Sequence, residues 1–225
     1  ERQASVATAL NNGGELSLLL GDYPTAVEKL DRALALLEKV ETGGDAPGNN
    51  LTRKARIHHN LSEARSAQGM PSAAGIEALR ANEIHQALAE ENPESAATAR
   101  LLAFSSLQLA RKLQAANKSE EALPHAHESA GLIGKLESEN IANEPDLSLL
   151  ASTAFEIGRI QRSLGKLEDA IKFQIEAIDR YLALASSRPE VADYRFQLAR
   201  AYGEAADLAQ LLAETAETSE ANSEA

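Results

Sequence analysis

The sequence contains no cysteine and no tryptophan, and aromatic residues make up only 4% of its 225 positions. Without cysteine, this chain forms no disulfides and no thiolate metal sites. Scarce aromatic residues disfavour a β-sandwich, because aromatic and β-branched side chains are enriched in strands. Alanine is abundant, and hydrophobic residues reach 44%. The composition therefore favours helices that pack closely through small side chains.

Basic residues are also few, with 22 Lys and Arg against 34 Asp and Glu, which gives a formal net charge of −12. Such an acidic chain is a poor candidate for nonspecific nucleic-acid binding, which depends on a basic surface. No apolar run approaches the roughly 20 residues of a membrane span. We therefore expect no nucleic-acid partner and no membrane contact by this segment.

The sequence carries no secretory signal and begins at Glu1 rather than at a methionine. We expect it to be a piece of a longer protein. A cytoplasmic location is favoured, and an extracytoplasmic one would follow if a membrane span precedes the segment.

The segment Ala154–Ala177 predicts two helices joined by a tight turn. Apolar residues recur at helical spacing on both sides of Gly165. A glycine there allows the left-handed backbone that a sharp reversal requires. Gly158 and Ala170 are small residues placed where the two helices would touch. One such hairpin cannot bury its apolar face alone, so copies of it are expected elsewhere in the chain.

The same pattern occurs four times, at intervals of 48 residues. The small residue after the turn is Ala26, Ala74, Ala122 or Ala170. The turn residue is Gly21, Gly69, Asn117 or Gly165. The small residue of the first helix is Gly14, Ser62, Ala110 or Gly158, with Ala206 in a fifth, partial copy. Small residues that face each other let two helix backbones approach closely, which is the physical reason for the pattern.

Two of these copies, GDYPTAVEKLDRALAL at Gly21–Leu36 and LGKLEDAIKFQIEAI at Leu164–Ile178, resemble the tetratricopeptide repeat (TPR) family. The resemblance covers about residues 4–213. The period departs from the family, because TPR copies are usually about 34 residues long. The longer period implies about two extra turns per helix. HEAT and armadillo repeats, with periods near 40–47, are the alternative.

The resemblance implies an all-α fold, an α-α superhelix or TPR-like solenoid of four long helical hairpins plus a terminal capping helix. We predict one domain over residues 1–213. Its copies span about 4–48, 49–93, 94–144 and 145–188, with the capping helix in 189–213. Pro124 predicts a late start or a mild kink in its helix. The acidic tail 214–225 is predicted to be disordered, because it lacks large apolar residues.

No motif for catalysis is present: the sequence lacks a P-loop, G-x-S-x-G, H-E-x-x-H and a set of kinase motifs. The glycine-rich stretch Gly43–Gly48 follows a helix and lacks the Lys-Ser/Thr that binds phosphate. The pairs His58/His59 and His125/His127 do not have the spacing of metal ligands on a helix. We therefore expect no enzyme activity, no cofactor and no metal.

In TPR proteins the first helix of each hairpin lines an inner groove that binds peptides, and the resemblance carries this role to specific positions here. The implied partner-binding residues are Arg56, His59, Glu63, Phe104, Arg111, Gln114, Phe155, Arg159, Arg162 and Arg200. Guanidinium groups in a concave site suit carboxylates or phosphates, so one hypothesis is an acidic or phosphorylated peptide. Phe104, Leu107 and Phe155 would add an apolar anchor. The alternative is that the arginines pair with Glu15, Glu63 and Asp207 on neighbouring helices and that the Phe residues pack against the second helices.

The predicted function is that of a non-catalytic protein–protein interaction scaffold that binds a peptide or protein. The segment Ser186–Glu204 in its long-period context resembles the C-terminal repeat regions of large bacterial serine/threonine protein kinases. That resemblance implies the sensor or scaffold part of a bacterial signalling protein. A self-association module is the alternative function, and the sequence leaves the oligomeric state open.

Overall fold

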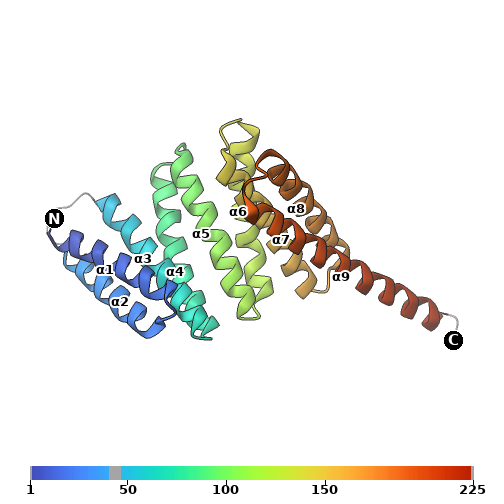
Figure 1. Ribbon diagram of the computed structural model, residues 1–225, viewed down its shortest axis with the longest axis horizontal. Helices are drawn as coiled ribbons and strands as arrows, with labels where there is room; N and C mark the ends of the chain where they lie inside the picture. Colours follow the sequence, from blue (N-terminus) through green and yellow to red (C-terminus); the bar gives the residue numbers. More distant parts are fainter. Residues whose placement is uncertain (1, 41–46, 224–225) are drawn as a thin grey trace. The chain divides into compact units, whose positions relative to one another are not determined.

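The computed structural model describes residues 2–40 and 47–223, and over these ranges every regular element is an α-helix (Figure 1). The helices are α1 (Arg2–Leu19), α2 (Tyr23–Val40), α3 (Pro47–Ala67), α4 (Pro71–Glu91), α5 (Ala96–Ala115), α6 (Ser119–Ser138), α7 (Glu144–Ser163), α8 (Leu167–Ser187) and α9 (Ala192–Ser223). Helices α1 and α2, α3 and α4, and α7 and α8 form hairpins with short turns. The predicted all-α class is confirmed.

The four turns repeat the same backbone geometry. The turn residues Gly21, Gly69, Asn117 and Gly165 have φ values of 76°, 73°, 59° and 74°. In each copy the amide after the turn residue donates a 2.9 Å hydrogen bond to the carbonyl five residues earlier. This is the Schellman arrangement, which satisfies the last carbonyls of a helix. The turn register predicted from the sequence is confirmed.

Helix α9 extends beyond the range predicted for the capping helix, and Pro124 does not delay the start of α6. Helix α6 begins at Ser119 and continues through Pro124, so the late start that was one of two expectations does not occur. Helix α9 continues past its predicted end at Ala213 to Ser223. Most of the tail that was expected to be disordered, 214–225, is therefore helical in the structure. The glycine-rich stretch Gly43–Gly48 lies outside the described residues up to position 46, and α3 begins at Pro47.

The chain divides into two compact units, Glu1–Lys118 and Ser119–Ala225. A single repeat domain over 1–213 stays a prediction. The division falls in the turn between α5 and α6. Each unit has its own core. In the first, the core residues are Ala7, Leu30, Ala33, Leu37, Ile57 and Leu61. In the second, they are Ala151, Ala154, Phe155, Ala177, Ile178, Tyr181, Leu184, Tyr194 and Ala201.

Small residues bring the helices of a hairpin close together. A methyl group added at Gly14 would lie 2.8 Å from the Leu30 side chain, and one at Gly158 would lie 2.6 Å from Nε2 of Gln174. Ser62, in the equivalent position of α3, donates a 2.8 Å hydrogen bond to the carbonyl of Ala74. The packing role that the repeat assigned to these positions is therefore present in both units.

Candidate partner-binding faces

The predicted site residues lie on the first helices of the hairpins, and these fall in different units. Helices α3 and α5 of the first unit carry Arg56, His59, Glu63, Phe104, Arg111 and Gln114. Helices α7 and α9 of the second unit carry Phe155, Arg159, Arg162 and Arg200. The structure thus defines two candidate faces, which are described separately.

Polar side chains connect α3 to α1 in the first unit. Arg56 donates a 3.0 Å hydrogen bond to Oδ1 of Asn12, and its Nε lies 3.9 Å from a carboxylate oxygen of Glu15. Asn60 is buried, and its amide donates to Oδ1 of Asn11 at 2.8 Å and to Glu15 at 2.9 Å. Arg56 is therefore already engaged within the chain, as the alternative interpretation of the arginines expects.

Helix α3 meets α5 through one aromatic and one ionic contact. The His59 ring lies edge-on to Phe104, with ring centroids 5.3 Å apart. Nζ of the buried Lys112 lies 2.8 Å from a carboxylate oxygen of Glu63. Burial lowers the pKa of His59 despite the opposing charge of Glu63, so the ring is neutral near pH 7. Phe104 remains 40% exposed, which makes it the open apolar group of this face.

The remaining predicted residues of α5 are less open. Arg111 and Gln114 are partly buried. Leu107, which the sequence suggested as part of an apolar anchor, is fully buried and belongs to the interior.

A second histidine of the first unit is buried on α4. His85 is 7% exposed, and its Nδ1 has no hydrogen-bond partner among the described residues. Burial, together with the nearby His59, lowers the pKa of His85 to about 4. The fold therefore holds a neutral imidazole in an environment that opposes its protonation.

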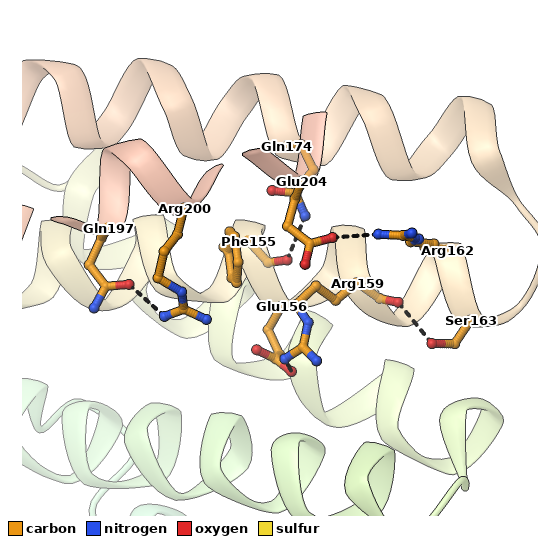
Figure 2. A network of polar contacts seen from close by, with 9 residues as sticks. All are labelled: Phe155, Glu156, Arg159, Arg162, Ser163, Gln174, Gln197, Arg200 and Glu204. Atoms are coloured by element: carbon orange, nitrogen blue, oxygen red, sulfur yellow. Dashed lines mark hydrogen bonds and ion pairs between the residues drawn. The ribbon is translucent and has the colours of Figure 1, made fainter. Parts of the chain in front are cut away.

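In the second unit, Arg162 bridges α7 and α9. Its Nη1 lies 2.9 Å from a carboxylate oxygen of Glu204 (Figure 2). The same atom lies 3.9 Å from a carboxylate oxygen of Asp207. Two acidic groups therefore offset this guanidinium, and its main contribution is to hold the two helices together.

Phe155 and Arg200 form a stacked pair between the same helices. The Arg200 guanidinium lies over the Phe155 ring, 4.9 Å from the centroid, and donates a 2.8 Å hydrogen bond to Gln197 (Figure 2). Phe155 is 5% exposed and belongs to the core, so it does not provide an open anchor in this structure. Arg200 is exposed, and no carboxylate lies within 4.0 Å of it among the described residues.

Arg159 lies one helical turn after Phe155 on α7. Its Nη1 lies 3.3 Å from Oε1 of Glu156, whose side chain is only 4% exposed, while Arg159 itself is 41% exposed. The carboxylate binds one side of the guanidinium and leaves other N–H groups directed to solvent. Arg159 and Arg200 therefore form the cationic part of this face.

The sequence reasoning missed a series of polar residues at one position of the first helices. Its members are spaced by 48 residues and are Asn12, Asn60, Gln108, Glu156 and Glu204. Asn12, Glu156 and Glu204 are partners of the predicted arginines. A polar residue at the same place in every copy was a visible signal, but it was hidden because acidic residues are common throughout the chain.

Other kinds of site are sparse in the part of the chain that the structure describes. No group of three or more His, Cys, Asp or Glu side chains there has a geometry that could hold a metal ion. No helix within the described ranges has the length and apolarity to cross a membrane. A small pocket lined by Thr8, Asn11, Arg53 and Arg56 has room for about one water molecule, which is too little for a substrate.

Comparison with solved structures places this architecture among TPR-like proteins. A Podosopora anserina protein described as putative kinesin light chain nearly identical TPR-like repeats is 19% identical, with 97% of this chain and 98% of that chain covered and a TM-score of 0.61. BtubC (BKLC) from P. vanneervenii is 15% identical over 94% of this chain and 82% of its own, with a TM-score of 0.59.

A third similar structure is the Rap conjugation gene regulator of the plasmid pLS20 in complex with the Phr peptide. It is 12% identical over 92% of this chain and 53% of its own, with a TM-score of 0.53. No protein-family model matches the sequence, and no curated protein matches it. At these identities the likeness establishes the fold, an all-α TPR-like solenoid of helical hairpins.

Proposed function

We propose that this protein is a non-catalytic protein-interaction module, and that the face formed by α7 and α9 binds an acidic segment of a partner. The single observation that carries the proposal is Arg200. Its guanidinium lies over the Phe155 ring, is exposed, and has no carboxylate partner among the described residues. A cation that is positioned by stacking loses little side-chain entropy when it binds a carboxylate or phosphate in two-point geometry.

Arg159 strengthens this face. Residues four apart on a helix share one side, so Arg159 and Phe155 are neighbours, and Arg200 covers Phe155. An incoming carboxylate would meet the open N–H groups of both arginines. Arg162 is a weaker contributor, because Glu204 and Asp207 already neutralise it.

The comparisons support this proposal at the level of the fold. One structure of similar fold contains a bound peptide, and long helical repeats in general offer extended surfaces for partners. The first unit offers a separate apolar contact point in Phe104, which is exposed beside His59.

A peptide titration tests the proposal. A short fluorescein-labelled oligoglutamate peptide is titrated with the full chain and followed by fluorescence anisotropy, and an oligoglutamine peptide of equal length serves as the neutral probe. We expect binding of the acidic probe only, weakened about tenfold by Arg200→Gln, which corresponds to about 1.4 kcal/mol. Arg32→Gln is the matched control, because Arg32 is an exposed arginine on α2. Equal affinities for Arg200→Gln and the unaltered protein would exclude this face.

We also propose, from the sequence resemblance alone, that the segment belongs to a larger signalling protein such as a bacterial serine/threonine kinase. The complete gene product is then expected to encode a kinase catalytic domain upstream of Glu1. A complete reading frame without such a domain would remove this part of the proposal and leave the binding face unaffected.

A further inference from the structure

Helix α9 is the first helix of a partial fifth copy, and only one of its two packing faces is covered. On the side of α9 that faces α8, the buried residues occupy the same repeat positions as buried residues of α7. Tyr194, Ala201 and Leu208 are buried, as are their equivalents 48 residues earlier in α7. The side chains of α9 thus follow the repeat on this side.

The other face of α9 differs from its counterpart in α7. In α7 the counterpart residues are buried, and they are Ala151, Ala154, Phe155, Gly158 and Gln161. In α9 the residues in the same register are exposed, and they are Ala199, Tyr202, Gly203, Ala206 and Ala209. Both sets recur at intervals of three and four residues, so each forms a single stripe along its helix.

The second helix of the hairpin explains why the stripe on α7 is buried. Helix α8 places Gln174 against Gly158, and Gln174 donates a 3.0 Å hydrogen bond to the carbonyl of Phe155. The stripe on α9 occupies the repeat positions that in α7 contact the second, antiparallel helix of the hairpin, so it is suited to contact another antiparallel helix. Tyr202 of this stripe is 51% exposed, and Phe196, near the edge of the stripe, is 61% exposed. Together with the small residues of the stripe, they leave α9 exposed where the other copies have a second helix.

The size of residue 206 specifies the helix that fits. Where the first helix has glycine, the second helix has a large residue, as in Gly14 with Leu30 and Gly158 with Gln174. Where the first helix has the larger Ser62, the equivalent residue of α4 is Ala78. We therefore expect the helix that packs on Ala206 to have a small residue at the contact, because a large residue there would overpack it.

We propose that the occupant is α9 of a second copy of this chain, bound antiparallel about a two-fold axis at Ala206. A two-fold interface brings the same surface of both copies together, so a residue n positions before Ala206 meets the residue n positions after it. The pairs then combine one small residue with a small or large one in nearly every case: Ala206 with Ala206, Gly203 with Ala209, Tyr202 with Gln210, Ala199 with Ala213 and Phe196 with Ala216. No pair places two aromatic rings against each other.

Helix α9 is long enough to form these pairs. The helix continues to Ser223, and its C-terminal turns extend beyond α7 and α8 (Figure 1). Residues 213–216 are exposed there, so they are accessible to Phe196 and Ala199 of the other copy. One helix face is smaller than the roughly 800 Å² per partner of a standard interface, and the dimer is accordingly expected to be concentration-dependent.

This inference and the proposed peptide face are tested at different residues. Arg200 is turned about 120° from Ala206, the centre of the stripe, and it lies one helical turn from Phe196 at the edge of the stripe. Ala206→Arg tests dimerisation and Arg200→Gln tests peptide binding, so failure of one proposal is distinguishable from failure of the other.

Mass measurement tests the dimer. Light scattering of the full chain over a concentration series is expected to rise from 24.0 kDa toward twice that mass. Ala206→Arg places a long charged side chain on the axis and should return the protein to 24.0 kDa without loss of helicity, because Ala206 is exposed. The control is Ala183→Arg, an exposed alanine of α8. A mass of 24.0 kDa at all concentrations, or a dimer that Ala206→Arg leaves intact, would overturn the proposal.

Cysteine cross-linking tests the register, and the absence of native cysteine makes it clean. Ala206→Cys should form an intermolecular disulfide in air, because cysteines near the axis meet the Cα separation of about 4.4–6.8 Å that the bond needs. A mixture of Gly203→Cys and Ala209→Cys should form mixed dimers in preference to either homodimer, as antiparallel pairing requires. Cross-linking of Ala206→Cys no faster than that of Ala183→Cys would exclude contact at this face. Preferred homodimers of Gly203→Cys would exclude the antiparallel register.

Discussion

The hairpins α3–α4 and α7–α8 share one repeat register, but they place the larger, polar residue of the contact on different helices. In the first, Ser62 and Ala78 occupy the repeat positions that Gly158 and Gln174 occupy in the second, where Gly158 lies against Gln174. Ser62 uses its hydroxyl to bond the carbonyl of Ala74 at 2.8 Å. Gln174 instead reaches past Gly158 to the carbonyl of Phe155 at 3.0 Å. Both solutions fill the contact and give a buried polar atom a backbone partner.

A second pair of equivalent positions shows where the solutions are unequal. His85 of α4 corresponds to Tyr181 of α8. The Tyr181 hydroxyl hydrogen-bonds to the Ser152 hydroxyl at 2.8 Å, whereas Nδ1 of His85 has no partner among the described residues. A buried polar atom without a partner is costly, so the first unit carries a weakness at a position where the second has none. In these hairpins the repeat register constrains the combined size of two facing side chains closely and their polarity loosely.

The largest expected effect is at the glycine of the second hairpin. Gly158→Leu should lower the free energy of unfolding by about 3 kcal/mol, because its Cβ alone would already lie 2.6 Å from Gln174 and 3.1 Å from the carbonyl of Ala170. Chemical denaturation measures the change. Gly131→Leu on α6 is the control, since a methyl group at Gly131 meets no atom within 4 Å. Equal losses for the two variants would show that the hairpin contact is not tight.

Acid should destabilise the first unit through His85. Its folded pKa of about 4 lies below its ordinary value of 6.5, so the unfolded chain binds more protons between these values. Stability is then complete above about pH 6.5 and falls as the pH drops toward 4, by about 2 kcal/mol at pH 5 if His85 acts alone. Denaturation at pH 7 and pH 5 measures this.

His85→Leu is the matched variant, because Leu37 and Ile133 occupy the same place in other copies. It should flatten the pH dependence, and His59, whose pKa is also lowered by burial, should account for the remainder. If the free energy of unfolding of His85→Leu depended on pH as strongly as that of the unaltered protein, His85 would not be the cause of the acid destabilisation.

The hydroxyl of the α3–α4 hairpin has a smaller effect. Ser62→Ala removes the hydrogen bond to the carbonyl of Ala74 and should cost about 1 kcal/mol. Thermal unfolding followed by circular dichroism detects it. The third copy has alanine at the equivalent position, Ala110, so the volume is tolerated. A loss comparable to that of Gly158→Leu would mean that packing, rather than the bond, is essential.

The smallest effect is expected when the second unit is given the glycine–leucine pair of the hairpin α1–α2. Gln174→Leu reproduces the Gly14–Leu30 pair in the second unit and also removes Oε1 of Gln174, which has no partner among the described residues. The lost bond to Phe155 and the removed buried polar atom should offset each other to within about 1 kcal/mol. Parallel denaturation of Gln174→Leu and Gln174→Ala checks this, and Gln174→Ala should be clearly less stable because it leaves a cavity.

Much of the fold was accessible from the sequence because its signals are local. A left-handed turn residue recurs at Gly21, Gly69, Asn117 and Gly165, and the structure gives each a positive φ. Helix α4 begins at Pro71 and ends at Glu91, because proline favours the first turn and Asn92-Pro93 interrupts the helix. The length of α9 was missed, because the weakly apolar residues after Ala213 gave no periodic signal.

The candidate site was less accessible, because exposure and pairing depend on residues far apart in the chain. An open apolar anchor was one of two interpretations of Phe155, and Leu107 was suggested for the same anchor, yet both side chains are buried. Their helical spacing is the same whether a neighbouring helix covers them or not. Arg162 was expected to face a ligand or Asp207, and the nearer partner proved to be Glu204, which lies 42 residues along the chain.

The sequence by itself determined the 48-residue period, the turns and the small residues between paired helices, because these depend on backbone conformation and on contacts within one hairpin. Only the tertiary structure decided which side chains remain exposed, which arginines are already paired and where the chain divides into two units. Those properties arise from packing between helices of different copies, whose residues are distant in sequence. The uncovered face at Ala206 illustrates both, since the repeat predicts the contact and the structure shows that no described residue fills it.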